Sequence, residues 1–244
     1  MSIYVEDLDK LKKIQNFSLP VRLKERMNLK LVVIIIMIVG LIQASSQTNK
    51  NSILFDAVKE YATGHEVVNF GCLPDDIIKF SYIEISIEIG ILLASKAVDF
   101  VVTGCSSGQG MMLACNNLPG VICGYAPTPK DAYLFAQINN GNAISLPLGE
   151  EYTYSGSENC KRTIEMLFCE SFGQGYPKEQ SARKISDAKL LKSVKEKSQV
   201  DFITLLERLD DNLITKVLQK NNVVDYVLNN GTDIAIINWI KQHI

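Results

Sequence analysis

A cysteine and a serine in a glycine-rich turn are the residues of this chain best suited to chemistry. The run V-D-F-V-V-T-G-C-S-S-G-Q-G, residues 98–110, leads from an apolar strand into a turn that holds Cys105 and Ser107. Good helix formers follow at residues 111–115, so the pattern predicts a strand, a tight turn and the beginning of a helix. The free backbone N–H groups at such a helix start favour negative charge.

This turn has a chemical and a structural interpretation. A thiol beside an anion-attracting turn can serve as a nucleophile or as a proton carrier. Turns in parallel sheets also need small residues, and Cys105 would then be an inert buried thiol. The turn taken alone leaves both interpretations open.

Composition excludes several classes of protein. Of the 244 residues, 47% are apolar and 21% are charged, as is typical of a folded globular chain. The net charge of −2, without a long run of Lys or Arg, argues against a nucleic-acid partner. The six cysteines form no C-x-x-C pair and only two histidines exist, so we expect no metal site. Dispersed thiols in a chain of this size indicate the cytoplasm.

Strands and helices are predicted to alternate from residue 31 to residue 149. The apolar run at 31–42 could be a signal peptide, but its long lead-in carries Asp and Glu, and the run is too short to span a membrane. We therefore interpret it as a buried strand. Further strands are predicted at 67–70, 98–103, 120–124 and 143–147, and helices at 50–63, 82–97, 111–115 and 128–139.

This alternation predicts an α/β fold with a doubly wound parallel sheet, a Rossmann-like three-layer sandwich. Ligands of such sheets bind beyond the carboxyl ends of the strands. The polar loops at 43–49, 104–110 and after residue 124 would meet there. The helix at 82–97 is apolar nearly all round, so we expect it to be buried, for instance at a subunit interface.

The remainder of the chain is predicted to be helical. After residue 156 the strand pattern stops, and Trp239 is expected to be a core or oligomer contact. We expect three parts: an N-terminal extension with a short amphipathic helix at 1–30, the α/β domain at 31–155, and a small helical C-terminal region at 156–244. Helices in this last part are predicted at 159–172, 198–219, 223–228 and 233–243.

The order of elements and four motifs resemble one family. After the turn the chain reads A-C-N-N, then G-V-I-C-G, then Q-I-N-N-G-N before a strand. With the cysteine–glycine turn, this pattern resembles the ribose-5-phosphate isomerase B / galactose-6-phosphate isomerase family of sugar-phosphate isomerases. The resemblance covers residues 31–190 in element order and is specific over 105–110 and 137–142.

The resemblance implies an aldose–ketose isomerase that uses no metal or organic cofactor. Cys105 would be the base that moves a proton between C1 and C2, and the Ser107 hydroxyl would assist at the substrate oxygens. The family forms dimers or larger homo-oligomers, with sites built from two subunits. The backbone N–H groups that would hold the enediolate belong to Ser106, Gly108, Gln109 and Gly110.

Several family residues are replaced in this chain. The ring-opening histidine falls on Ile138, an Asp-His pair falls near Gln43 and Ala44, and an arginine falls on Ile122. Asn139 and Asn142 are kept, and they either contact the sugar or end a helix. The remaining candidates for substrate binding are Gln43, Ser45 and, for the phosphate, Arg183.

Three functions follow from these residues. The first is an isomerase of a phosphorylated sugar with Cys105 as base. The missing histidines keep a second possibility open, a protein that binds a sugar phosphate without turnover. A nucleotide-using oxidoreductase is the weakest, because the turn lacks a full G-x-G-x-x-G motif and no Walker lysine follows it.

Overall fold

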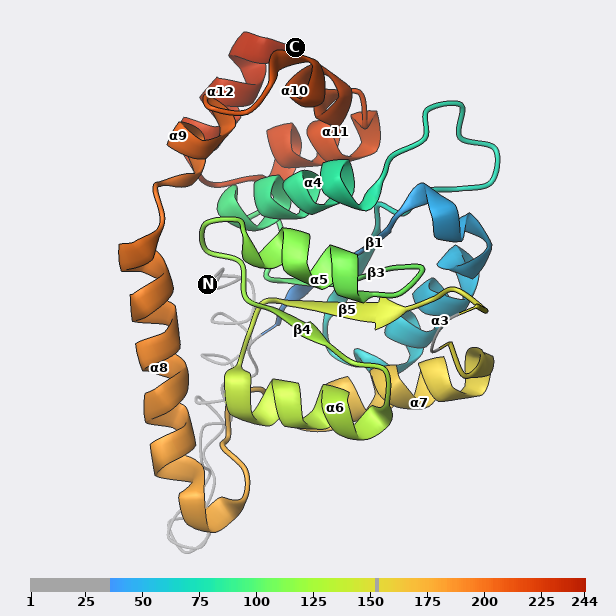
Figure 1. Cartoon of the computed structure of the whole chain (residues 1–244), viewed down its shortest axis with the longest axis vertical. Helices are drawn as coiled ribbons and strands as arrows, with labels where there is room; N and C mark the ends of the chain where they lie inside the picture. Colours follow the sequence, from blue (N-terminus) through green and yellow to red (C-terminus); the bar gives the residue numbers. More distant parts are fainter. Residues whose placement is uncertain (1–35, 152–153) are drawn as a thin grey trace, which may run out of the picture. The chain divides into compact units, whose positions relative to one another are not determined.

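Five parallel strands form the centre of the fold (Figure 1). The computed structural model describes residues 36–151 and 154–244, so the helix predicted within 1–30 and the first part of the strand predicted at 31–42 lie outside the described residues. The sheet order is β2-β1-β3-β5-β4, which confirms the doubly wound parallel sheet. The strands are β1 (Ile38–Gln43), β2 (Glu66–Asn69), β3 (Phe100–Cys105), β4 (Cys123–Tyr125) and β5 (Ala143–Pro147).

Helices cover both faces of the sheet, as predicted for apolar parallel strands. Alternate residues of each strand enter different cores, so Phe100 and Val102 of β3 face one layer while Val101 and Cys105 face the other. The first layer contains α3 (Asn51–Tyr61), α6 (Pro129–Leu134) and α7 (Gly156–Phe168), and the second contains α4 (Tyr82–Ala94) and α5 (Gln109–Asn116).

Helix α4 forms although its isoleucines alternate as in a strand. Ser81 and Glu84 build a capping box at its start, which satisfies backbone N–H groups that the helix cannot pair itself. The helix is buried nearly all round, as predicted. Its outer side is covered by α10 (Asp211–Leu218) and α11 (Asn221–Asn230) of the same chain.

Several element ends differ from the predicted ones. The loop predicted at 43–49 contains the last residue of β1 and then a 3-10 helix, η1 (Ser45–Lys50). Strand β4 lies three residues later than predicted at its start, and the helix predicted at 128–139 ends in a π-helical turn, η2 (Phe135–Asn139). These shifts leave the order of elements unchanged.

The C-terminal region is helical, but its division into helices was predicted wrongly. The single helix expected at 198–219 is two, α9 (Phe202–Leu206) and α10. Asp201 and Asp210 accept hydrogen bonds from the N–H groups that begin these helices, and such capping favours a new start over continuation. The sequence prediction missed α8 (Ser181–Ser198), whose only buried residue is Ala188, because no apolar periodicity marks it.

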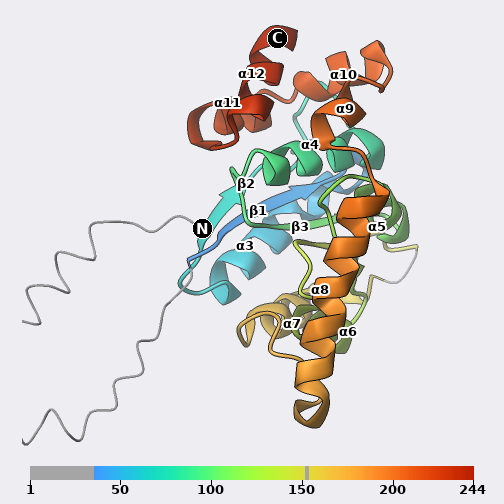
Figure 2. The same ribbon diagram turned by 90° about the vertical axis from the view of Figure 1, so that its left-hand side faces the viewer.

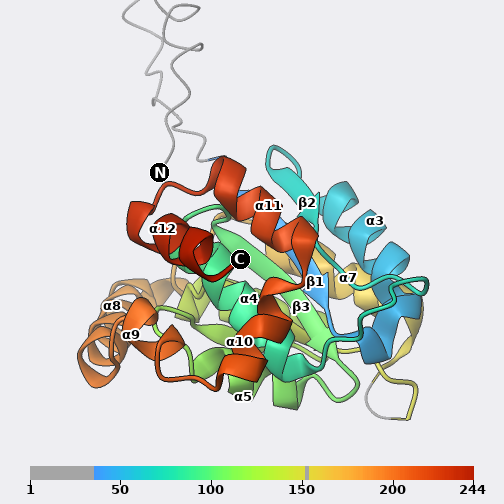
Figure 3. The same ribbon diagram turned by 90° about the horizontal axis from the view of Figure 1, so that it is seen from above.

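The last four helices pack together beside α4, and α8 packs against η2 (Figures 1 and 2). Seen from above, α10, α11 and α12 (Ile234–His243) lie over α4, which itself lies over β1 and β3 (Figure 3). Trp239 is 5% exposed and belongs to the core on this side, which confirms its predicted role. Within the described chain, no helix is long and apolar enough to cross a membrane.

Candidate active site

The turn after β3 has the backbone that the sequence predicted. Cys105 ends the strand, α5 begins at Gln109, and Gly108 stands before it with a φ of +74°. A Cβ at Gly108 would lie 2.8 Å from backbone atoms of Leu146 and Pro147, so glycine is required here for space as well as for conformation. No side chain among the described residues caps this helix end, and its first N–H groups therefore remain available to an anion.

This turn lies at the point where the sheet topology switches direction. The chain passes from β1 outward to β2, and then returns to place β3 on the other side of β1. Gln43, the last residue of β1, pairs in register with Gly104, next to Cys105. Doubly wound sheets bind their ligands at the carboxyl edge of such a switch point. We call the loops at this end of β1, β3 and β5 the carboxyl edge.

Cys105 and Ser107 are both unengaged at this edge. Cys105 is 7% exposed and belongs to the core on the face of the sheet that α4 and α5 cover. Ser107 is half-buried. Among the described residues, neither the thiol nor the hydroxyl has a hydrogen-bond partner. Tyr82 and Tyr125 place their rings beside Gly110 and Gly108 and flank the turn.

Hydrogen bonds from neighbouring segments hold the turn in place. The N–H of Leu148 donates to the Cys105 carbonyl at 3.0 Å, and the N–H of Gly149 donates to the Ser106 carbonyl at 2.9 Å. Gln47 Nε2 donates to Ser106 Oγ at 2.9 Å, and Ser145 Oγ donates to the Gly108 carbonyl at 2.7 Å. Neither Gln47 nor Ser145 was predicted for the site; the polar loop at 43–49 was a signal for the former, and nothing in the sequence marked the latter.

Gln43 and Ser45, predicted to contact substrate, are engaged by the chain itself. Gln43 is fully buried, donates to the Cys72 carbonyl at 2.7 Å and accepts from Asn51 Nδ2 at 2.9 Å. Ser45 exchanges two hydrogen bonds with the backbone of Phe80, at 2.8 and 3.0 Å. Both residues thus lie at the carboxyl edge and fix its shape.

Three other predicted residues lie away from this edge. Asn142 precedes β5, so it is at the amino edge of the sheet, where its side chain accepts from the Ile122 N–H at 2.8 Å and donates to the Gly120 carbonyl at 2.9 Å. Asn139 is exposed at the end of η2. Arg183 is on α8 and pairs with Asp187 at 3.0 Å. One copy of the chain does not bring these residues to Cys105.

Both histidines make their contacts outside the Cys105 turn. His65 comes just before β2, accepts from the Met37 N–H at 3.2 Å, and has its pKa lowered by burial, with Asp99 acting in the opposite direction. His243 stacks on Trp239 in the last helix. Ile138, at the position of the family histidine, lies in η2 and lines a small pocket against α8.

Lys50 is a buried cation at the carboxyl edge. Lys50 pairs with Glu150, which follows the β5 loop, and its ammonium lies 3.9 Å from the centre of the Tyr154 ring. Burial raises the pKa of Tyr154, and Lys50 opposes that shift. Among the described residues, no group of His, Cys, Asp and Glu is arranged to hold a metal.

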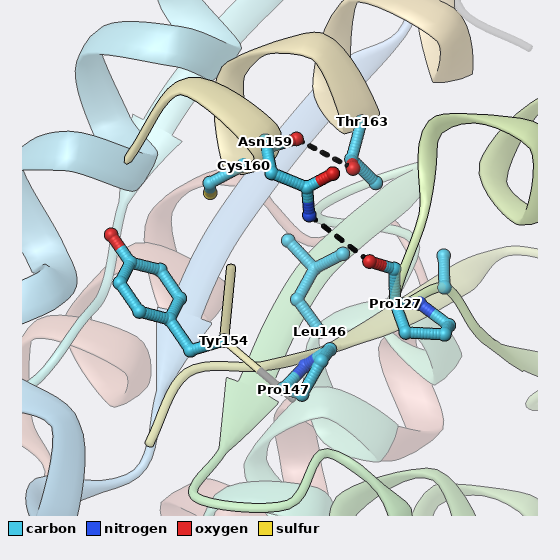
Figure 4. A pocket seen from close by; sticks show the side chains of 8 residues that line it. Pro127, Leu146, Pro147, Tyr154, Asn159, Cys160 and Thr163 are labelled. Atoms are coloured by element: carbon cyan, nitrogen blue, oxygen red, sulfur yellow. Dashed lines mark hydrogen bonds between the residues drawn. The ribbon is translucent and has the colours of Figure 1, made fainter. Parts of the chain in front are cut away.

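A small pocket lined by Tyr154 lies on the α7 face of the sheet, whereas Cys105 faces the side of α4 and α5. Figure 4 shows Leu146 and Pro147 on one side of it and Asn159, Cys160 and Thr163 of α7 on the other. Its volume of about 10 Å³ leaves room for no more than one water molecule. Burial raises the pKa of Cys160 to about 11, so this thiol is protonated at neutral pH. None of the predicted site residues lines the pocket.

Comparison with known proteins decides the family. The model of the family described as Ribose/Galactose Isomerase matches residues 39–187, which include the Cys105 turn and all of the sheet except Ile38. The chain belongs to the ribose/galactose isomerase family. This confirms the resemblance found in the sequence. No curated protein sequence matches the chain significantly.

Two solved structures are 35% identical to this isomerase-family chain. One is a 4-deoxy-L-threo-5-hexosulose-uronate ketol-isomerase complexed with a tartrate, with a TM-score of 0.80 over 85% of this chain and 99% of that one. The other is the ribose-5-phosphate isomerase LacAB_rpiB from Vibrio parahaemolyticus, with a TM-score of 0.81 over 86% and 100%. The type B ribose 5-phosphate isomerase from Trypanosoma cruzi is 22% identical, with a TM-score of 0.55 over 66% and 99%, and shares the fold. Family and neighbours together indicate a sugar isomerase.

Proposed function

We propose that this protein is an aldose–ketose isomerase of a phosphorylated sugar that works through an enediolate with Cys105 as base. The observation that carries the proposal is the unengaged thiol of Cys105 beside the uncapped start of α5, at the switch point of the sheet. A base next to a carbon and N–H donors next to its oxygen are the two requirements of this reaction.

The reaction returns every proton that it removes, so it requires no co-reactant. The Cys105 thiolate removes the proton from the carbon beside the carbonyl, and the negative oxygen that forms is held by N–H groups of Ser106, Gly108, Gln109 and Gly110. Ser107 passes the hydroxyl proton between the two oxygens. Cys105 then returns its proton to the neighbouring carbon, so the sugar is isomerised with no net oxidation.

We further propose a homodimer or larger homo-oligomer in which a second copy completes the site. Asn139 at the end of η2 and Arg183 on α8 are exposed in one copy, and they would reach Cys105 from the other copy. Exposed apolar side chains next to the carboxyl edge fit such a contact, with Ile77 exposed to 96%. The others are Leu73, Ile78, Tyr82 and Ile83.

A ketol-isomerase of a sugar acid is a second candidate. Planar guanidinium groups are the preferred partners of phosphate. The arginines among the described residues lie on α7, on α8 and after α9, and not in the turn that holds Cys105. One of the two neighbours at 35% identity is a uronate ketol-isomerase. A substrate carboxylate carries less charge than a phosphate and needs fewer cations to bind.

Solvent exchange tests these proposals together. The protein is incubated in D2O with pentose phosphates, hexose phosphates and 4-deoxy-L-threo-5-hexosulose-uronate, and deuterium at the carbon next to the carbonyl is followed by NMR. We expect exchange with a phosphorylated sugar; exchange with the uronate alone would favour the second candidate. A sugar phosphate that raises the melting temperature without any exchange would show a binding protein and overturn both.

A further inference from the structure

Four charged residues meet where the C-terminal helices cover α4. Glu84 of α4 pairs with Lys216 of α10 at 2.9 Å near the surface. One turn further along each segment, Glu88 and Lys220 are 1% and 5% exposed. Both carboxylate oxygens of Glu88 lack a hydrogen-bond partner among the described residues, and burial raises the pKa of Glu88 while the nearby Lys220 ammonium opposes that shift.

Lys220 also contacts a segment that shapes the carboxyl edge. Its ammonium lies 5.4 Å from the centre of the Phe80 ring, a cation–π distance, and it acts electrostatically on Cys72. The N–H of Phe80 donates to Ser45 Oγ and the N–H of Ser45 donates to the Phe80 carbonyl, while burial raises the pKa of Cys72 and the neighbouring Ser45 hydroxyl opposes that shift. Lys220 thus supports Ser45 through two neighbours.

Ser45 begins the 3-10 helix that holds the catalytic turn. Two residues later in η1, Gln47 donates to Ser106 Oγ at 2.9 Å, and Ser106 directly follows Cys105. A displacement of Phe80 therefore moves the donor that fixes the turn. The family model ends at residue 187, so Lys220 comes from helices beyond the matched region, whereas all the other residues of this path lie within it.

We propose that Lys220 is a positioning residue, through which the C-terminal helices hold the Cys105 turn in its working geometry by way of Phe80, Ser45 and Gln47. The role of the turn in catalysis rests on the proposed function; the mechanical connection does not. Enzyme rates are sensitive to displacements of about 1 Å in groups that contact the reacting atoms, so a support this close to the turn affects turnover.

The test compares Lys220→Met with the matched control Lys216→Met in the full-length protein. Lys220→Met keeps the apolar stem and removes the charge, and we expect kcat to fall about tenfold or more with KM changed less. Lys216→Met breaks a partly exposed ion pair that does not touch Phe80, and should leave kcat within about twofold. Lys220→Arg retains the charge and should restore most of the activity.

A second measurement is independent of turnover. Alkylation by iodoacetamide, quantified for the Cys105 peptide by mass spectrometry, should be several times faster in Lys220→Met, because a loosened turn exposes a thiol that is now nearly buried. Equal alkylation rates in the two Met variants, or an equal kcat, would overturn the inference. If the wild-type protein turns over no sugar, the proposed function fails while the alkylation rates still decide this one.

Discussion

The two edges of the sheet both carry polar side chains, but these differ in whether the fold itself occupies their hydrogen-bonding groups. At the carboxyl edge the Cys105 thiol and the Ser107 hydroxyl are unengaged among the described residues, and α5 begins without a side-chain cap. At the amino edge both polar ends of the Asn142 side chain are paired with the chain's own backbone. Polar groups already paired within the fold stabilise it, and groups left unpaired beside a helix start can serve a ligand.

This difference indicates separate roles for residues that the same family motifs had suggested as site residues. The side chain of Asn142 joins the segments before β4 and β5, so we expect a structural role for it and a chemical role for Cys105. Asn139 is exposed, and in one copy of the chain it lies neither beside Cys105 nor among the hydrogen bonds of Asn142. Substitutions at the two edges should therefore affect different quantities, activity at one and unfolding free energy at the other.

The largest expected effect is at Cys105. Cys105→Ser should lower kcat by about 10²–10⁴-fold, because the base that abstracts the carbon-bound proton is replaced by a weaker acid. The melting temperature should change little, since the two side chains are similar in size. Steady-state kinetics with the substrate identified by deuterium exchange measure this, with Cys169→Ser, at an exposed cysteine, as control. Full activity of Cys105→Ser would remove the proposed base.

The next effect concerns the backbone of the turn. Gly108→Ala combines a left-handed φ with a Cβ 2.8 Å from backbone atoms, and should cost about 2–4 kcal/mol of unfolding free energy. Gly120→Ala is the matched control: its φ is +75° but its Cβ would meet open space, so we expect about 1–2 kcal/mol. Urea unfolding measures both. Equal losses would show that packing against β5 does not fix the turn.

Asn142 should behave as the reverse of Cys105. Asn142→Ala leaves the Ile122 N–H and the Gly120 carbonyl without their partner, and should cost about 1–3 kcal/mol while kcat stays nearly constant. Asn139→Ala, at an exposed position, should leave stability unchanged and raise KM if a second copy completes the site. A large fall in kcat for Asn142→Ala would contradict the contrast between the two edges.

The last predicted effect is a pH dependence of the unfolding free energy that arises from Glu88 of α4. Burial raises the pKa of Glu88 well above its ordinary value, with Lys220 acting in the opposite direction. The folded protein then keeps a proton that the unfolded chain loses, so stability is complete below the unfolded pKa and declines as pH rises toward the folded one. The slope from this group is at most about 1.4 kcal/mol per pH unit.

Glu88→Gln should remove this slope, because the amide does not titrate. Unfolding free energies of the two proteins measured across that pH range should therefore converge at low pH and separate as pH rises, with the wild type the less stable. Parallel curves would mean that Glu88 is ionised in the folded protein throughout.

The predicted roles of the two edges differed in accuracy for a physical reason. The sequence indicated that Gln43 and Ser45 lie at the carboxyl edge, and they do. It gave no sign that Asn51, Cys72 and Phe80 would occupy their hydrogen-bonding groups, because these partners are up to 35 residues away along the chain. Where a residue lies follows from local pattern, and which partner it finds follows from the packing of distant segments.

The sequence by itself determined the order of strands and helices in the α/β domain, the glycine turn and the family motifs, since apolar periodicity and turn residues act over a few neighbours. Tertiary structure decided the rest. It covered α4 with helices of the same chain, buried Lys220 and Glu88, and separated Asn142, before β5, and Arg183, on α8, from Cys105. Burial and pairing of this kind depend on contacts between segments far apart in sequence, which no local pattern records.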